Sequence, residues 1–247
     1  GRKRMRDITL EELLEAGCHF GHQVNRSYPK ASEFIFEARN NVHIIDLAKT
    51  KERLEAAADF VKTQASLGST IIFIGTKRQG KVILKEEAKR AGVFYVDQRW
   101  IGGTLTNFEE IAKNFQKLKD FRSRLENKDE VAKYTKREVG LWRKEMFSLE
   151  SLYGGIEGME KIPDVLFVVD THLEISAVNE AIKMGVTTVG IVDTNADPSI
   201  IDYSIPANDD AVGSIKLIVS YIADAWIEGK TEGLKKAKEA EAKEKKK

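Results

Sequence analysis

A glycine-rich segment has the residue types of a phosphate-binding loop. Gly75–Lys81 reads Gly-Thr-Lys-Arg-Gln-Gly-Lys, follows an apolar run and precedes a helical pattern, so it matches such a loop up to its last position. Backbone N–H groups in that loop cradle phosphates, and its lysine reaches the outer phosphates. Asp170, which ends another apolar run, would be the metal-binding acid of the same site. The chemistry would be magnesium-dependent nucleotide hydrolysis.

The residue after this segment argues against such an enzyme. Val82 stands where the loop needs a serine or threonine to bind magnesium. Two other interpretations stay open. One is a plain strand-to-helix turn in which Gly75 supplies backbone freedom, and the other is a surface where Lys77 and Arg78 meet RNA phosphates at the carboxyl end of a strand. The sequence has no nucleophile elbow, paired-cysteine motif or His-Glu-x-x-His helix, so we expect no enzyme.

A second segment, Arg99–Asn107, combines a cation, an indole ring and a double glycine. Arg99 could contact a phosphate, Trp100 could stack on a base, and the glycines allow close approach to the backbone. The alternative is a tight turn in which Trp100 is a core anchor and Asn107 caps the next helix. The two interpretations are compatible if Trp100 fixes a loop whose Arg99 and Thr106 face outward.

Further basic residues extend the predicted RNA-binding surface. Six of them, against two acids, lie within 113–128 on the helical pattern that follows, which gives this stretch a charge of +4. A lysine-rich helix face is usually only solvated, but this excess lies on a segment expected to project from the protein. A polar loop near the N-terminus contributes two more cations. The full predicted RNA-binding set is Arg26, Lys30, Lys77, Arg78, Arg99, Trp100, Thr106, Asn107, Lys113, Lys117 and Arg124.

Composition limits the class of protein. A chain of 247 residues with 42% hydrophobic residues can bury a sizeable core, and no run approaches the roughly 18 apolar residues of a membrane helix. The first ten residues are basic and then polar, so we expect no targeting segment. Cys18 is the only cysteine, which fits a reducing, cytoplasmic setting. Because the net charge is only +1, any RNA-binding surface must be local.

The elements that would position these residues follow an α/β pattern. The short β-branched runs are apolar on both faces, as the strands of a parallel sheet covered by helices must be. We therefore predict a doubly wound parallel sheet. A capping box at Thr9–Glu12 predicts a short helix before it. The runs are 42–45, 70–74, 93–96, 165–169 and 187–192, and the helical patterns between them are 47–67, 78–91 and 175–184.

An insertion interrupts this alternation between the third and fourth runs. Two stretches, 108–125 and 139–153, each carry one apolar seam at helical spacing, and a polar segment separates them. The pattern predicts an antiparallel coiled-coil hairpin over 107–153, inserted in an α/β domain formed by 1–106 and 154–228. The tail, 229–247, has eight lysines, four glutamates and almost no large apolar residues, so we expect a fraying helix or disorder there.

Three segments of the chain are distinctive in composition: Ala16–Gln23, Arg99–Asn107 and Ile162–Asp170. Together they resemble the S2 family of small-subunit ribosomal proteins in its bacterial form. Smaller matches accompany them, and the resemblance runs in order from about Ile8 to Glu228. The family has a flavodoxin-like sheet with an inserted helical hairpin, which agrees with the pattern above.

This resemblance implies a structural, non-catalytic function in translation. The protein would sit on the cytoplasmic ribosome and touch small-subunit rRNA with basic loops and its coiled coil. It would also contact other ribosomal proteins and help to anchor the large mRNA-binding one. The resemblance implies no small-molecule substrate, no membrane and no required cofactor.

The resemblance also implies a metal site in some members, where zinc sits on residues matching His22, Asp193, Asp209 and Asp210. One imidazole and several carboxylates suit tetrahedral zinc. A histidine in a turn is more often a packed residue, however, and the aspartates could be separate helix caps. Crowded carboxylates repel each other, so their convergence would need a metal, a nearby lysine or arginine, or hydrogen bonds. Both a structural zinc site and a purely polar junction stay open.

Overall fold

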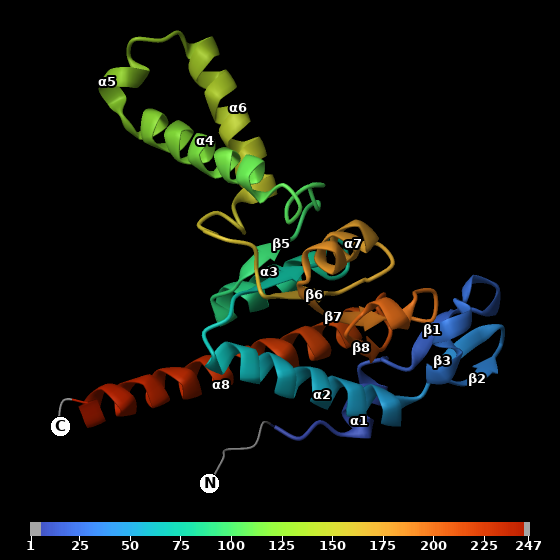
Figure 1. Cartoon of the computed structure of the whole chain (residues 1–247). Helices are drawn as coiled ribbons and strands as arrows, with labels where there is room; N and C mark the ends of the chain where they lie inside the picture. Colours follow the sequence, from blue (N-terminus) through green and yellow to red (C-terminus); the bar gives the residue numbers. More distant parts are fainter. Residues whose placement is uncertain (1–5, 245–247) are drawn as a thin grey trace.

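An α/β body carries a projecting helical hairpin in this protein (Figure 1). The structure is a computed structural model that describes residues 6–244, with side chains through residue 239. The body is built on a five-stranded parallel sheet of order β5-β4-β6-β7-β8. In chain order these strands are β4 (Ile71–Ile74), β5 (Phe94–Val96), β6 (Val165–Val168), β7 (Thr187–Val192) and β8 (Tyr203–Pro206).

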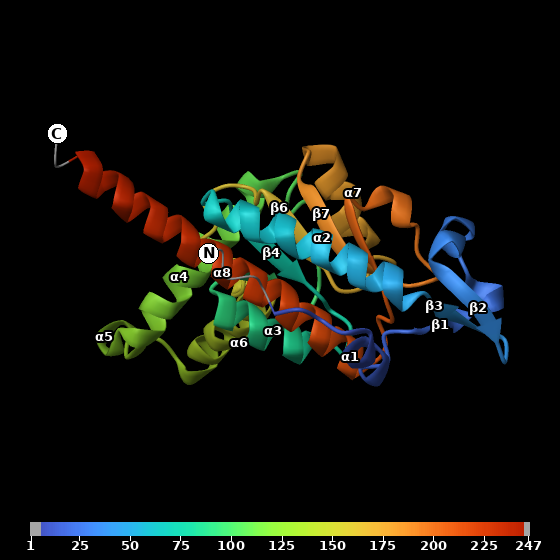
Figure 2. The same cartoon turned by 90° about the horizontal axis from the view of Figure 1, so that it is seen from below.

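Alternate residues of each strand face opposite layers of helices. Ile71 and Phe73 belong to one apolar cluster, whereas Ile72 and Ile74 belong to the other. This arrangement confirms the predicted doubly wound α/β fold. None of the described helices is long and apolar enough to cross a membrane. One layer consists of α2 (Leu47–Ser66), α3 (Lys81–Ala91) and α8 (Val212–Glu244), and the other of α7 (Ile175–Met184) and the base of the hairpin (Figure 2).

The first predicted run, 42–45, lies outside the parallel sheet, so that part of the prediction is wrong. As β3 (Val42–Ile45) it pairs antiparallel with both β1 (Phe20–Gln23) and β2 (Ile35–Arg39). β-Branched residues favour a strand but do not select its partner, and here the partners are the segments nearest in the chain. The fifth parallel strand is β8. Its Pro206 suits an edge position because proline cannot donate a ladder hydrogen bond.

Short helices join the antiparallel sheet to the body. In α1 (Leu10–Glu15), Thr9 and Glu12 form the predicted capping box, which satisfies two free backbone N–H groups at the start of the helix. The remaining short helices are η1 (Val24–Arg26), η2 (Pro29–Phe34) and η3 (Pro198–Ile200).

The insertion between β5 and β6 is a hairpin whose first helix leaves the body and whose last helix returns to it (Figure 1). Its two long helices contact each other. The predicted capping box, Thr135 with Glu138, starts the returning helix. Regular coiled-coil packing along the hairpin stays a prediction. The helices are α4 (Phe108–Glu126), α5 (Lys128–Val131) and α6 (Lys136–Tyr153).

The last helix, α8, packs along α2 and then continues away from the body as far as Glu244 (Figures 1 and 2). The sequence predicts either a fraying helix or disorder for 229–247. In the structure 229–244 is helical, and residues 245–247 lie outside the described residues. The two helices approach closely at Gly229, where a Cβ atom would overlap the carbonyl oxygen of Lys62.

Candidate nucleic-acid interface

Apart from the three hairpin cations, the predicted site residues lie on segments at one edge of the parallel sheet. Because the five strands are parallel, the segments that follow them all emerge at the same edge. The N-terminal unit, which runs from α1 to β3 (residues 10–45), also packs there. Tyr28 N donates to Thr194 O at 2.7 Å, and Asn208 N donates to Cys18 O at 3.0 Å. The sheet thereby brings together residues that are far apart in the sequence.

Lys77 points into this edge rather than toward solvent. Its ammonium group lies 3.0 Å from Asp170, 2.7 Å from Asp209 and 2.6 Å from Asp210, and only 15% of its side chain is exposed. Burial alone would lower the pKa of Lys77, but these carboxylates outweigh it and raise the pKa. Lys77 is therefore the countercharge of these carboxylates inside the protein. It does not belong to the exposed surface that is predicted to contact RNA.

The four residues of the implied metal site do converge. His22 Nδ1 lies 3.1 Å from Asp193 Oδ1, at an angle that makes no hydrogen bond, and His22 Nε2 lies 3.5 Å from Asp210 Oδ2. His22, Asp193 and Asp209 each offer one ligand atom within 4.8 Å of the others. Asp210 is half exposed and also pairs with Lys77, so it lies outside this compact group of three. The neighbouring Asp193 carboxylate raises the pKa of His22, although burial opposes it.

The Asp209 carboxylate is buried, and only one of its two oxygens has a hydrogen-bond partner. The side chain is 1% exposed, and its Oδ2 atom has no hydrogen-bond partner. Burial, together with the charges of Asp170 and Asp193, raises the pKa of Asp209 above its ordinary value, although the Lys77 ammonium opposes this shift. An orphaned carboxylate oxygen beside an imidazole and a second carboxylate fits the donor set of a zinc ion. The residues are therefore compatible with the metal that the family resemblance implies.

Three of the predicted RNA-binding cations are exposed and unpaired. Among the residues that the structure describes, Arg26, Arg78 and Arg99 take part in no ion pair or hydrogen bond through their guanidinium groups, so these remain available to a ligand. Lys30 is exposed too, but its ammonium contacts Asp197 at 3.2 Å and Ser199 at 2.7 Å.

The Arg99–Asn107 loop is ordered from within the protein. Trp100 is only 8% exposed, so it anchors the core and cannot stack on a base, which corrects one of the two interpretations of this residue. Its indole Nε1 donates to Glu180 Oε1 at 3.0 Å. Thr106 donates to the same carboxylate, and Asn107 holds the N-cap position of α4 without a side-chain capping bond. Only Arg99 presents a charge outward from this loop.

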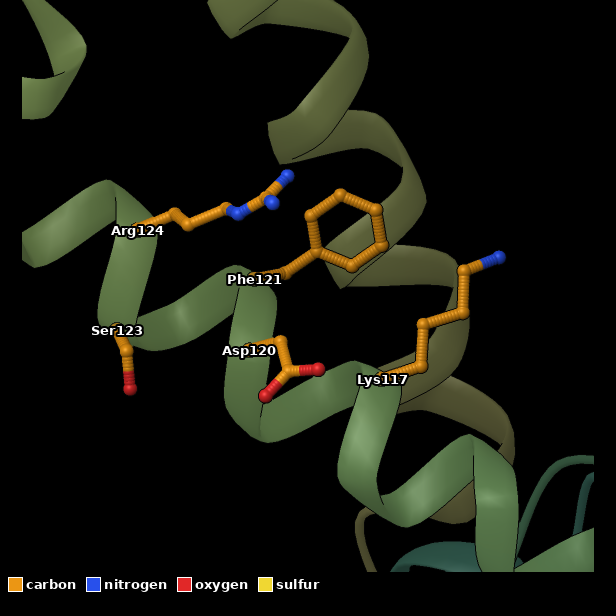
Figure 3. Close-up of a pocket in the computed structure, with 5 residues that line it drawn as sticks. All are labelled: Lys117, Asp120, Phe121, Ser123 and Arg124. Atoms are coloured by element: carbon orange, nitrogen blue, oxygen red, sulfur yellow. The ribbon is translucent and has the colours of Figure 1, made fainter.

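The predicted hairpin cations are exposed but paired. Lys113 contacts Glu110 at 2.5 Å, Lys117 contacts Glu145 at 2.6 Å, and Arg124 lies 3.7 Å from Glu130. Figure 3 shows Phe121 and Arg124 pointing from α4 toward α6, where they line a pocket of about 470 Å³ with Lys117. The hairpin thus offers cations beside an aromatic ring, although each cation already has an acidic neighbour.

Comparison with known proteins decides the family. The model of the ribosomal protein S2 family matches residues 13–229. The chain belongs to the ribosomal protein S2 family. Three similar proteins are each called small ribosomal subunit protein uS2. They come from Dictyoglomus thermophilum (49% identical over 92% of this chain and 92% of the relative), Coprothermobacter proteolyticus (49%, 90% and 83%) and Microcystis aeruginosa (47%, 92% and 85%).

As a member of the S2 family, the chain is a structural ribosomal protein and not an enzyme. The alternative of a nucleotide-binding enzyme built on Gly75–Lys81 gains no support from these relatives. The structure gives a physical reason, because the lysine at position 77 is held by three carboxylates that would repel a phosphate. Val82 is exposed and offers no oxygen to magnesium.

Sequence reasoning missed a second group of cations, which lies on the returning helix of the S2 hairpin and just before it. They are exposed and, within the described part of the chain, form no ion pairs. A net charge count over α6 does not reveal them, because its four cations are offset by three glutamates. The group is Lys133, Lys136, Arg137, Arg143 and Lys144.

Proposed function

We propose that this chain is a structural constituent of the small ribosomal subunit that binds small-subunit rRNA through the carboxyl edge of its sheet and the exposed face of its hairpin. Its site of action is the cytoplasmic ribosome, and its other partners are neighbouring ribosomal proteins, including the large mRNA-binding one. The observation that carries the proposal is the pair Arg78 and Arg99, which follow the adjacent strands β4 and β5 and are both exposed and unpaired.

The physical argument is electrostatic. Ile74 and Val96 end the two neighbouring strands in register, so the segments that carry the two arginines start side by side at one edge of the sheet. An unpaired guanidinium can contact a phosphate through two parallel hydrogen bonds without first breaking an internal ion pair. Each such contact releases counterions from the RNA, which makes binding depend on salt. A chain with a net charge of only +1 needs such a local surface.

The test is binding of purified protein to small subunits depleted of it, measured by sedimentation over a range of salt concentrations. R78E/R99E is expected to bind at least tenfold more weakly and to reduce the log–log salt slope by about one unit per lost phosphate contact. K89E/K183E is the matched control, because Lys89 and Lys183 are exposed cations in the last turns of α3 and α7 and the double variant changes the net charge equally. Equal binding by wild type and R78E/R99E would refute the proposed surface.

A structural zinc ion is a second candidate ligand. His22, Asp193 and Asp209 would hold it, and Asp209 could use Oδ2 for the metal while Oδ1 stays with Lys77. The ion would neutralise buried carboxylates at the junction between the N-terminal unit and the sheet. Elemental analysis after dialysis against zinc should give one ion per wild-type chain and none per H22A chain. Equal zinc content in both proteins would exclude this set of ligands.

A further inference from the structure

One carboxylate organises the whole loop between β5 and α4. Glu180 Oε1 accepts hydrogen bonds from Trp100 Nε1 at 3.0 Å and Gly103 N at 2.8 Å. Its Oε2 accepts from Leu105 N at 2.9 Å, Thr106 N at 3.1 Å and Thr106 Oγ1 at 3.2 Å. Five donors from one loop therefore converge on a single side chain of α7. No sequence pattern predicts this contact, because Glu180 is 74 or more residues away from the donors.

The loop around Glu180 is built like an anion-binding nest. Gly103 has φ +92°, a conformation that L side chains rarely adopt, and it turns its backbone N–H toward the carboxylate. Successive N–H groups aimed at one point form a concavity that binds anions. Here the protein supplies the anion itself. Burial alone would raise the pKa of Glu180, but the loop donors outweigh it and lower the pKa, so the side chain stays charged.

This anchoring acts on both sides of the loop. Trp100 directly follows Arg99, one of the exposed arginines of the proposed RNA surface. Thr106 lies two residues before α4, so its two hydrogen bonds to Glu180 fix the point where the hairpin leaves the body. Asn107 provides no side-chain cap, which leaves Glu180 as the polar anchor of this junction among the described residues.

We propose that Glu180 is a positioning residue for RNA binding: its carboxylate holds the 99–107 loop so that Arg99 and the hairpin meet small-subunit rRNA in a fixed orientation. The inference rests on the proposed function and goes beyond it, because Glu180 itself need not touch RNA. Without the carboxylate, several N–H groups would lose their acceptor, and the loop would sample other conformations. Binding would then cost the entropy of ordering the loop and the hairpin.

The test compares E180A, E180Q and D164A in the full-length protein. Asp164 is a matched control, because its carboxylate also accepts a backbone N–H and a hydroxyl, from Thr70 at 2.7 and 2.9 Å, but at the opposite edge of the sheet. In E180A, hydrogen exchange at Gly103, Leu105 and Thr106 should become at least tenfold faster, and binding to depleted small subunits at least tenfold weaker. D164A should match wild type within about twofold, both in the exchange rates of these amides and in binding to depleted small subunits.

Two further arms separate positioning from general stability. Acetate replaces the groups removed in E180A, so added acetate should restore part of the exchange protection and of the binding. E180Q should fall between wild type and E180A, because its amide keeps one acceptor oxygen but turns an NH₂ group toward backbone donors. If E180A does not fold, E180Q still allows exchange and binding to be measured.

The outcomes distinguish this inference from the proposed function. If R78E/R99E loses binding while E180A and E180Q bind like wild type, the positioning role of Glu180 is overturned and the RNA surface stands. Equal loss of binding in D164A and E180A would also overturn it, because the effect would then be one of stability. If R78E/R99E binds normally but the Glu180 variants do not, the proposed surface fails and the loop effect must act elsewhere, which overturns the inference in its present form.

Discussion

The Nζ atom of Lys77 lies 2.7 Å from Asp209 Oδ1 and so joins the turn after β4 to the segment after β8. In the sheet these two strands are separated by β6 and β7. The same ammonium group also contacts Asp170, which follows β6. One lysine therefore links the ends of three strands, and it balances carboxylates that would otherwise repel each other at close range.

Replacing Lys77 with methionine should strongly destabilise the fold. Methionine keeps most of the apolar volume but leaves Asp170 and Asp209 buried without their countercharge. Breaking a buried pair in this way costs about 3–5 kcal/mol of unfolding free energy. Urea unfolding followed by circular dichroism measures this change.

The neighbouring Arg78→Met is the control for that variant. Arg78 is exposed and unpaired among the described residues, so its loss should change the unfolding free energy by less than about 0.5 kcal/mol. If K77M is as stable as R78M, the ion pairs of Lys77 do not stabilise the fold.

Glu174 should give the unfolding free energy a dependence on pH. Its buried Oε1 accepts from Thr76 N at 3.0 Å and Thr76 Oγ1 at 2.6 Å. Burial, and secondarily the charge of Asp170, raises the pKa of Glu174 above its ordinary 4.5. The folded state then binds this proton more tightly than the unfolded state, so the stability it contributes is full below pH 4.5 and is lost as pH rises through the folded pKa.

Glu174→Gln tests this linkage. The variant cannot ionise, so its unfolding free energy relative to wild type should increase steadily as the pH is raised from about 4.5 toward neutrality. Urea titrations at a series of pH values give the difference. Glu86→Gln, at an exposed position of α3, should show a constant offset. A constant offset for E174Q as well would mean that Glu174 does not titrate differently in the folded state.

The sequence predicts most of the parallel sheet because its strands carry a strong signal. Every residue of 71–74 and 165–168 is buried. A strand that helices cover on both faces needs such an unbroken apolar run, and the run is easy to find in the sequence. β8 escaped prediction because Tyr203 and Ser204 weaken its apolar pattern. Strand partnership is set by tertiary contacts rather than by composition, so the sequence pattern places β3 in the wrong sheet.

The site is less predictable than the fold. His22 and Asp193 are far apart in the sequence, and no spacing rule connects them; their convergence was expected only from the family resemblance. The rule that strand ends share an edge places Lys77 correctly but does not show whether it faces RNA or an internal carboxylate. That choice depends on Asp209, whose burial follows from the packing of β8.

The hairpin cations allow stability and binding to be separated. Lys113, Lys117 and Arg124 form exposed ion pairs, and such pairs contribute only about 0–1 kcal/mol each. Reversing all three to glutamate should therefore leave the hairpin folded but deplete the protein from small subunits. Sedimentation of tagged protein, with helicity measured in parallel, checks both points. Unchanged co-sedimentation would remove α4 from the proposed RNA surface.

Two glycines in helices should respond oppositely to alanine. In a helix interior, Gly→Ala normally stabilises by roughly 0.5–1 kcal/mol because glycine loses more backbone entropy on folding. Gly140 in α6 should follow this rule, since nothing lies within 4 Å of an added Cβ. Gly229 in α8 should not, because a Cβ there would overlap the backbone of Lys62 in α2. Overpacking of this kind costs about 1–3 kcal/mol.

Thermal unfolding of the two single variants should therefore shift the midpoint up for G140A and down for G229A. A rise for G229A would show that α8 separates from α2 at this point, in conflict with their close packing.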